Sequence, residues 1–109
     1  ESLIDAVTAV SGSGPAYVFL LAEAMERAAI AEGLAADDAR TLVVQTLLGA
    51  GRMLVEDGAA PEELRRRVTS PGGTTQAALD SFTAGGFSAL VADAVHAARL
   101  RGAALARGD

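Results

Sequence analysis

Residues 16–32 read AYVFLLAEAMERAAIAE, and this stretch decides the fold class. Its apolar residues recur at the three- and four-residue spacing of one helical face, namely Val18, Leu21, Met25, Ala28 and Ala29. Other apolar side chains spread around the rest of the helix, and the charged residues leave only a narrow polar strip. A helix that is apolar on most sides is buried on most sides. We therefore expect this helix to lie between its own domain and a second subunit.

The sequence on both sides of this stretch also predicts helices, because no segment alternates apolar and polar residues over the length of a strand. We expect helices over residues 2–10, 39–56 and 61–67, one through residues 77–82, and a last one over about residues 87–106. The chain is thus predicted to be all-α: a single domain over residues 1–109, built as a bundle of about six helices.

Turn-forming and capping residues set the expected helix boundaries. In chain order they are the N-cap Ser2 with Asp5 at the capping-box position, the Ser11–Gly14 turn before Pro15, Gly33, the N-cap Asp37 or Asp38, Asp57–Gly58, and Gly85–Gly86.

The composition is apolar for so short a chain. Half of the 109 residues are hydrophobic, the mean hydropathy is +0.30, and cysteine is absent. Disulfides and thiolate metal sites are therefore excluded, and a single histidine excludes a histidine-rich metal cluster. A soluble chain this apolar is expected to hide part of its surface against a partner.

Neither a membrane span nor a signal peptide is expected. The longest uncharged run, Ala6–Ala22, is interrupted by Ser11–Pro15, which a membrane helix would tolerate poorly. The N-terminus begins with Glu1 and carries Asp5 in place of a basic region. The net charge of −5 also disfavours nucleic-acid binding, so an anionic ligand would need local donors.

The segment Val68–Thr75, which we call the 68–75 loop, contains the strongest candidate for a binding site. Its glycines allow the backbone to approach a ligand, and it leads into a helix whose first N–H groups lack intrahelical partners. The hydroxyls of Ser70, Thr74 and Thr75 add further donors and acceptors. The alternative is an ordinary capped turn between two helices, in which Ser70 or Thr74 only completes a helix, and the loop alone favours this alternative.

Three stretches resemble one known family, the pyrroline-5-carboxylate reductases. Residues 64–80, LRRRVTSPGGTTQAALD, are similar to the family signature. Residues 5–17, DAVTAVSGSGPAY, resemble the start of its helical domain, and Gly85-Gly86-Phe87 lies where the family has the same turn. The resemblance implies the C-terminal dimerisation domain, whose fold is like that of 6-phosphogluconate dehydrogenase C-terminal domains.

The family reduces 1-pyrroline-5-carboxylate to L-proline, in proline biosynthesis, with hydride from NADPH or NADH. The resemblance implies that the 68–75 loop contacts the substrate through Val68, Ser70, Gly72, Gly73, Thr74 and Thr75. Backbone N–H groups around Ser70, Gly72 and Gly73 would hold the carboxylate. Thr75 would hydrogen-bond the imine nitrogen and relay a proton from water. A cytoplasmic homodimer is implied, and in some members a larger ring of dimers.

The nucleotide-binding Rossmann domain of the family is not expected within these residues, because no strand–glycine loop–helix order occurs. The chain alone should therefore bind no NADPH or NADH and should be inactive by itself. Ser13 and Gly14 are candidates for contacts with the nicotinamide end of a cofactor, although a plain helix-breaking turn at Ser11–Pro15 is the favoured interpretation.

Three other features receive structural interpretations. Tyr17 is expected to pack with its hydroxyl satisfied. His96 lacks an obvious partner in the sequence and is expected to be structural or solvent-facing. The run Arg65–Arg67 is expected to compensate the negative end of a helix dipole.

Two alternatives to the reductase remain open. The chain would be a purely structural dimerisation module if it bound no carboxylate. The second alternative is the helical domain of a hydroxyacid or sugar-phosphate dehydrogenase. Such sites usually use a lysine for proton transfer, and the absence of lysine from this chain counts against that class.

Overall fold

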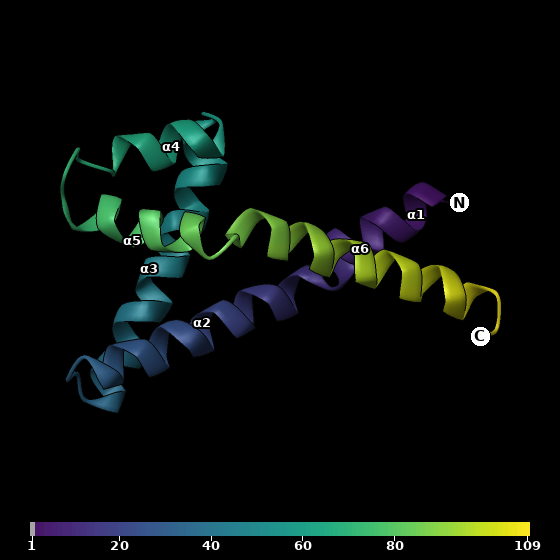
Figure 1. Ribbon diagram of the computed structural model, residues 1–109, viewed down its shortest axis with the longest axis horizontal. Helices are drawn as coiled ribbons and strands as arrows, with labels where there is room; N and C mark the ends of the chain where they lie inside the picture. Colours follow the sequence, from purple (N-terminus) through teal and green to yellow (C-terminus); the bar gives the residue numbers. More distant parts are fainter. Residues whose placement is uncertain (1) are drawn as a thin grey trace. The chain divides into compact units, whose positions relative to one another are not determined.

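The computed structural model describes residues 2–109, with Ser2 as backbone only, and these residues are almost entirely helical (Figure 1). The elements are α1 (Ser2–Val7), the π-helical segment η1 (Thr8–Gly12), α2 (Gly14–Ala31), α3 (Ala36–Asp57), α4 (Pro61–Arg67), α5 (Thr74–Ala84) and α6 (Phe87–Ala106). Residues 2–109 contain no strand, so the all-α prediction is confirmed. The predicted capping by Ser2 concerns a side chain outside the described part.

The chain divides into two compact units. Unit 1 contains the chain up to Val18 together with Ala78–Asp109, and unit 2 contains Phe19–Ala77. Helices α2 and α5 therefore contribute residues to both units. The single domain over residues 1–109 stays a prediction.

In unit 1, α6 packs against α1 and η1. Ala9 of η1 is the best-buried residue there, with 1% of its surface exposed. Gly102 of α6 lies beside the Asp5 carboxylate, and a Cβ at Gly102 would stand 3.4 Å from Asp5 Oδ1. The absence of a side chain at Gly102 thus lets α1 and α6 approach each other closely.

The predicted turn over Ser11–Gly14 is reduced to a bend at Ser13. The chain stays helical through Gly12, and the Ser13 N–H donates to the Thr8 carbonyl oxygen at 2.9 Å, which is the longer-range pattern of a π-helix. Helix α2 then begins at Gly14, so the missing N–H of Pro15 falls in the first turn, where it costs no intrahelical bond. A π-helical segment therefore carries the chain through a sequence that suggests a break.

This continuity changes one expectation. By length and composition alone, the span Leu3–Ala31 is long and apolar enough to cross a membrane. Only 6% of an apolar 18-residue segment within this span is buried in this chain. The expected interruption of the apolar run is limited to the bend at Ser13. The same exposed surface also fits a helix that is covered by a second protein chain.

In unit 2, the turn at Gly33 joins α2 to α3. Gly33 has a φ of +112°, and the Leu34 N–H donates to the Ala29 carbonyl oxygen at 3.1 Å, which closes the end of α2. Gly33 thus ends the helix, as predicted. Gly58, the C-cap of α3, is also left-handed, with a φ of +80°.

The predicted capping of α3 by Asp37 or Asp38 is wrong. The N-cap is Ala35, which makes no side-chain capping bond, and both aspartates lie in the first helical turn. There their charges stabilise the positive end of the helix dipole without capping it. Helix α4 has the predicted bounds, with Pro61 at its start and three arginines in its last turn.

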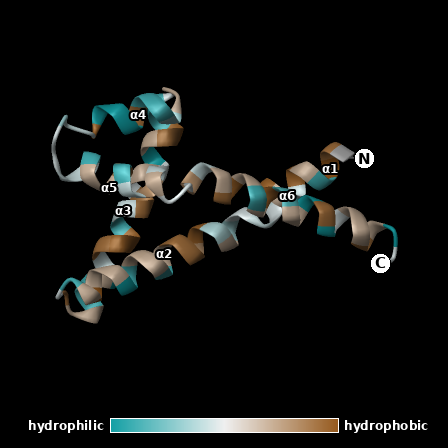
Figure 2. Cartoon of the chain, in the orientation of Figure 1, coloured by the Kyte–Doolittle hydropathy of each residue, from teal (hydrophilic) through white to brown (hydrophobic). Residues whose placement is uncertain are grey.

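The buried core within this chain is small. Four hydrophobic residues are buried among those described: Ala9, Ala39, Val43 and Leu64. No residue of α2 is buried, and Phe19 and Leu20 are 70% and 66% exposed. Figure 2 shows hydrophobic residues along α2 and α3. The burial that the sequence predicts for α2 is therefore not provided by this chain alone.

Candidate functional site

The 68–75 loop lies in unit 2 and connects α4 to α5. Its first residues complete α4: the N–H groups of Val68 and Thr69 donate to the carbonyl oxygens of Arg65 and Arg66 at 3.3 and 3.2 Å. The Thr69 hydroxyl donates to the Arg65 carbonyl oxygen. Thr69 was not among the predicted site residues, and both its N–H and its hydroxyl are used in hydrogen bonds that complete α4.

A tight turn follows over Ser70–Gly73. The Gly73 N–H donates to the Ser70 carbonyl oxygen at 3.1 Å, and Gly72 has a φ of +70°. Proline and then a left-handed glycine at the two central positions is the pattern of a type II turn. A Cβ at Gly73 would lie 3.3 Å from the Ser70 carbonyl oxygen, so the turn itself leaves little room for a side chain there.

Several hydrogen-bonding groups of the loop have no protein partner within residues 2–109. They are the hydroxyls of Ser70, Thr74 and Thr75, which lie on exposed residues, and the backbone N–H groups of Ser70, Gly72, Thr74 and Thr75. Neither Ser70 nor Thr74 makes the side-chain bond that the capped-turn alternative requires. The first turn of α5 contains no acidic residue, so nothing there opposes an anion. The loop therefore presents a set of donors at the positive end of a helix.

A cluster of charged residues stands directly before the loop. Glu63 accepts hydrogen bonds from Arg66 at 2.6 and 3.0 Å and from Arg67 at 3.1 Å, and Arg67 also donates to Asp57 at 2.9 Å. The bonds from Arg66, and then from Arg67, lower the pKa of the Glu63 carboxyl below its ordinary value. All three arginines lie in the last turn of α4, and compensation of the helix dipole by them stays a prediction.

The remaining candidates lie in unit 1. Ser13 stands between η1 and α2, and Gly14 is the first residue of α2. The half-buried Tyr17 donates its hydroxyl hydrogen to the Ala9 carbonyl oxygen at 2.6 Å, as expected for a packed tyrosine. His96 is exposed on α6, which agrees with a solvent-facing residue.

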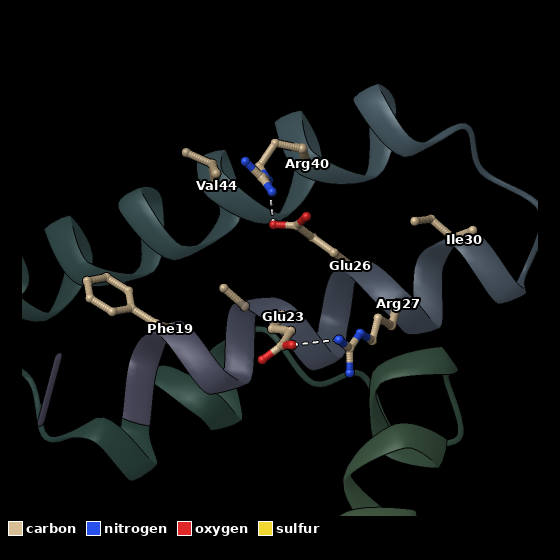
Figure 3. Close-up of a pocket in the computed structure, with 8 residues that line it drawn as sticks. Phe19, Glu23, Glu26, Arg27, Ile30, Arg40 and Val44 are labelled. Carbon is tan, nitrogen blue, oxygen red and sulfur yellow. Dashed lines mark hydrogen bonds and ion pairs between the residues drawn. The ribbon is translucent and has the colours of Figure 1, made fainter. Parts of the chain in front are cut away.

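A groove between α2 and α3 was not found from the sequence. It has a volume of about 460 Å³, lies within unit 2, and is lined by Phe19, Ala22, Glu23, Glu26, Arg27, Ile30, Arg40 and Val44. Figure 3 shows Arg40 of α3 pointing to Glu26 of α2, an ion pair of 2.7 Å, and Arg27 paired with Glu23 at 2.7 Å. The Glu26 bond raises the pKa of the Arg40 guanidinium. The sequence could not reveal the groove, because it forms only where two helices meet.

The glycines of the described residues that could suggest a dinucleotide fingerprint lie in helical segments. Gly12 ends a π-helical segment, and Gly49 and Gly51 lie inside α3, so none of these glycines follows a strand. No group of three or more acidic or histidine side chains within the described part lies close enough to hold a metal ion.

The model of the pyrroline-5-carboxylate reductase dimerisation family matches residues 1–105. The chain belongs to this family. It is 58% identical to the pyrroline-5-carboxylate reductase of Pseudomonas aeruginosa over 106 residues, which cover 97% of this chain and 39% of that protein. It is 54% identical to pyrroline-5-carboxylate reductase 2 of Bacillus subtilis over 79 residues, or 72% of this chain and 28% of that protein.

Solved structures of reductases have the same fold. A pyrroline-5-carboxylate reductase from Coxiella burnetii has a TM-score of 0.89 and 44% identity, over 93% of this chain and 37% of that one. A crystal structure of Plasmodium falciparum pyrroline carboxylate reductase with NADP bound has a TM-score of 0.89 and 36% identity, over 93% of this chain and 38% of that one. The chain thus spans less than half the length of the reductases that it matches.

Proposed function

We propose that this chain is the dimerisation and substrate-binding part of a pyrroline-5-carboxylate reductase, which reduces the C=N bond of 1-pyrroline-5-carboxylate to L-proline. Membership of the family supports the reaction. The unpartnered donors of the 68–75 loop, at the start of α5, are the observation that supports the substrate site. A purely structural module would leave these donors without a ligand. The helical domain of a hydroxyacid or sugar-phosphate dehydrogenase is disfavoured on another ground, because such sites use a lysine for proton transfer and the chain contains none.

The substrate carboxylate is proposed to bind at the loop. The chain carries a net charge of −5, so long-range attraction does not favour an anion, and short-range donors must hold it. The N–H groups of Ser70, Gly72 and Thr74 have no other acceptor within the described part. The Gly73 N–H is used by the turn, so the contribution of Gly73 is the space that its missing side chain leaves. Val68 flanks these groups and is 58% exposed.

Thr75 is proposed to act at the imine nitrogen. That nitrogen must gain a proton as hydride reaches the neighbouring carbon. A threonine hydroxyl is a poor acid, so it would accept a proton from water and pass its own to the nitrogen. The Thr75 hydroxyl is exposed and has no partner among residues 2–109, which leaves it free for both bonds.

The hydride would come from NADPH or NADH held by a Rossmann domain outside these residues. We propose that Ser13 and Gly14 contact the nicotinamide end. The π-helical segment before them supports this role, since such segments often occur at functional sites.

A second copy of the chain is proposed to cover the exposed apolar helices. This arrangement explains why α2 has no buried residue here, and it makes a membrane partner unnecessary for the apolar span Leu3–Ala31. A cytoplasmic enzyme that binds no nucleic acid, as a dimer or a ring of dimers, fits this proposal.

The test is a comparison of two substrates in the complete protein. With NADPH or NADH, it should reduce 1-pyrroline-5-carboxylate far more efficiently than 1-pyrroline, which has the same imine and no carboxylate. Equal kcat/KM values for the two substrates would contradict the proposed carboxylate site but would be compatible with the proposed reductase activity. A folded protein that reduces neither substrate with either cofactor would defeat the proposed function.

A further inference from the structure

Arg67 connects two helices directly before the 68–75 loop. Its Nη1 lies 2.9 Å from Asp57 Oδ2 at the end of α3, and its Nε lies 3.1 Å from Glu63 Oε2 within α4. Asp57 is itself oriented, because its Oδ1 accepts a hydrogen bond from the Ala59 N–H at 3.3 Å. The Arg67–Asp57 pair therefore closes the corner between α3 and α4.

The ion pairs Arg66–Glu63 and Arg27–Glu23 each lie within one helix and do not connect two helices. Arg66 bonds Glu63 three residues earlier in the same helix, so its pair spans no corner. The Arg67 and Asp57 side chains are 45% and 37% exposed, whereas those of the Arg27–Glu23 pair are 78% and 50% exposed. The pair that joins the two helices is thus also better shielded from water than a pair within α2.

The position of α4 depends on contacts with other elements, such as the Arg67–Asp57 ion pair. The helix has seven residues and one buried side chain, Leu64, and a helix this short is marginal without outside contacts. The loop starts at Val68, the residue after Arg67, and its first N–H groups bond to carbonyl oxygens of the last turn of α4. A displacement of α4 would therefore move the donors of Ser70 and Gly72.

We propose that Arg67 is a positioning residue for the 68–75 loop, which it holds in place through its ion pair with Asp57. Arg67 does not touch the substrate in this proposal. It keeps α4 against the end of α3, so that the loop donors stand ready for a carboxylate. The inference rests on the proposed function, because it assumes that the loop binds the substrate.

The test is steady-state kinetics of the complete reductase with three single variants. Arg67→Ala should raise KM for 1-pyrroline-5-carboxylate about two- to fivefold, the size expected from one exposed ion pair, and leave kcat nearly unchanged. Arg66→Ala is the matched control, because it removes an arginine of the same helix and the same partner but spans no corner. Its KM should equal that of the wild type.

Asp57→Asn separates positioning from simple attraction of an anion. It keeps the acceptor for the Ala59 N–H, weakens the pair with Arg67, and makes the protein more positive. Positioning predicts a higher KM, whereas attraction by charge predicts a lower one. The double variant Asp57→Asn, Arg67→Ala should be no worse than Arg67→Ala alone, because both changes break one contact.

Three results would overturn the inference: an unchanged KM in Arg67→Ala, equal increases in Arg66→Ala and Arg67→Ala, or a lower KM in Asp57→Asn. A wild-type protein that does not reduce 1-pyrroline-5-carboxylate would instead contradict the proposed function. If the unchanged KM in Arg67→Ala came with a fall in kcat and melting temperature, Arg67 would have a role in stability alone.

Discussion

The Thr75 hydroxyl is the single group on which the proposed chemistry depends most. Thr75→Val keeps the branched shape of the side chain and removes only the hydroxyl. A hydrogen bond to a charged group is worth about 1.5–3 kcal/mol, so kcat/KM should fall roughly ten- to hundredfold. Steady-state kinetics of the complete enzyme measure this change.

Thr75→Ser is the matched control, because it retains a hydroxyl at the same place, and it should keep most of the activity. Thr83→Ala removes another exposed hydroxyl of α5 and should leave the kinetics unchanged. If Thr75 only stabilises the start of α5, Thr75→Val would lower the melting temperature and leave kcat/KM intact. That result would remove Thr75 from the site.

The two glycines of the loop are poor probes of substrate binding. Gly72 adopts a left-handed conformation that other residues rarely take, and a Cβ at Gly73 would crowd the Ser70 carbonyl oxygen at 3.3 Å. Substitution at either position strains the turn before any ligand arrives. The hydroxyl of Thr75 can be removed without this strain, so it gives the clearer experiment.

At the scale of elements, the contact between α2 and η1 explains how the π-helical segment is held. The Tyr17 hydroxyl reaches back to the Ala9 carbonyl oxygen at 2.6 Å, and Ala9 is the best-buried residue of η1. The bond spans the Ser11–Gly14 sequence, where a break was expected. Tyr17 thus stabilises the continuous path from η1 into α2.

Tyr17→Phe should therefore lower the free energy of unfolding by about 0.5–1.5 kcal/mol, the net value of one such hydrogen bond. Chemical denaturation measures the loss. Ser11→Ala is the control, since it removes an exposed hydroxyl that bonds the Val7 carbonyl oxygen within one helical stretch, and it should change the stability by less than about 0.5 kcal/mol. Equal stabilities of Tyr17→Phe and the wild type would show that the bond does not hold the segment.

The sequence predicted the helices well where glycine or proline decides the backbone. Gly33, Gly58 and Gly86 all adopt positive φ at helix boundaries that were expected, and Pro61 starts α4. The sequence did not predict the helix boundaries where contacts between more distant residues determine the backbone. The Ser11–Gly14 stretch has the composition of a turn, but with the π-helical pattern and the Tyr17 bond only Ser13 lies outside a helix. The loss of capping at Asp37 follows from an earlier helix start.

The candidate site was predictable only as far as residue types go. Small residues and hydroxyls before a helix marked the 68–75 loop, and resemblance to a family supplied its proposed ligand. That the Gly73 N–H is used by the turn, or that Arg67 reaches Asp57, could not be predicted. Both contacts depend on the path of the backbone between α3 and α5.

At the scale of the whole molecule, the main feature is the mismatch between apolar composition and burial. Half of the residues are hydrophobic, but only four hydrophobic residues are buried among those described. Phe19 and Leu20 on α2 and Leu42 on α3 are each more than half exposed. Burial of apolar surface is the main force that stabilises a fold, and the proposed second copy of the chain would supply that burial for these helices.

The molar mass of the chain in solution tests this account most directly. Light scattering coupled to size exclusion, over a range of micromolar concentrations, should give twice the 11.0 kDa mass of one chain. Obligate interfaces commonly bury more than about 2,000 Å², so the dimer should not dissociate on dilution through this range. A folded, helical monomer of 11.0 kDa would contradict the account, because the exposed apolar helices would then need no partner.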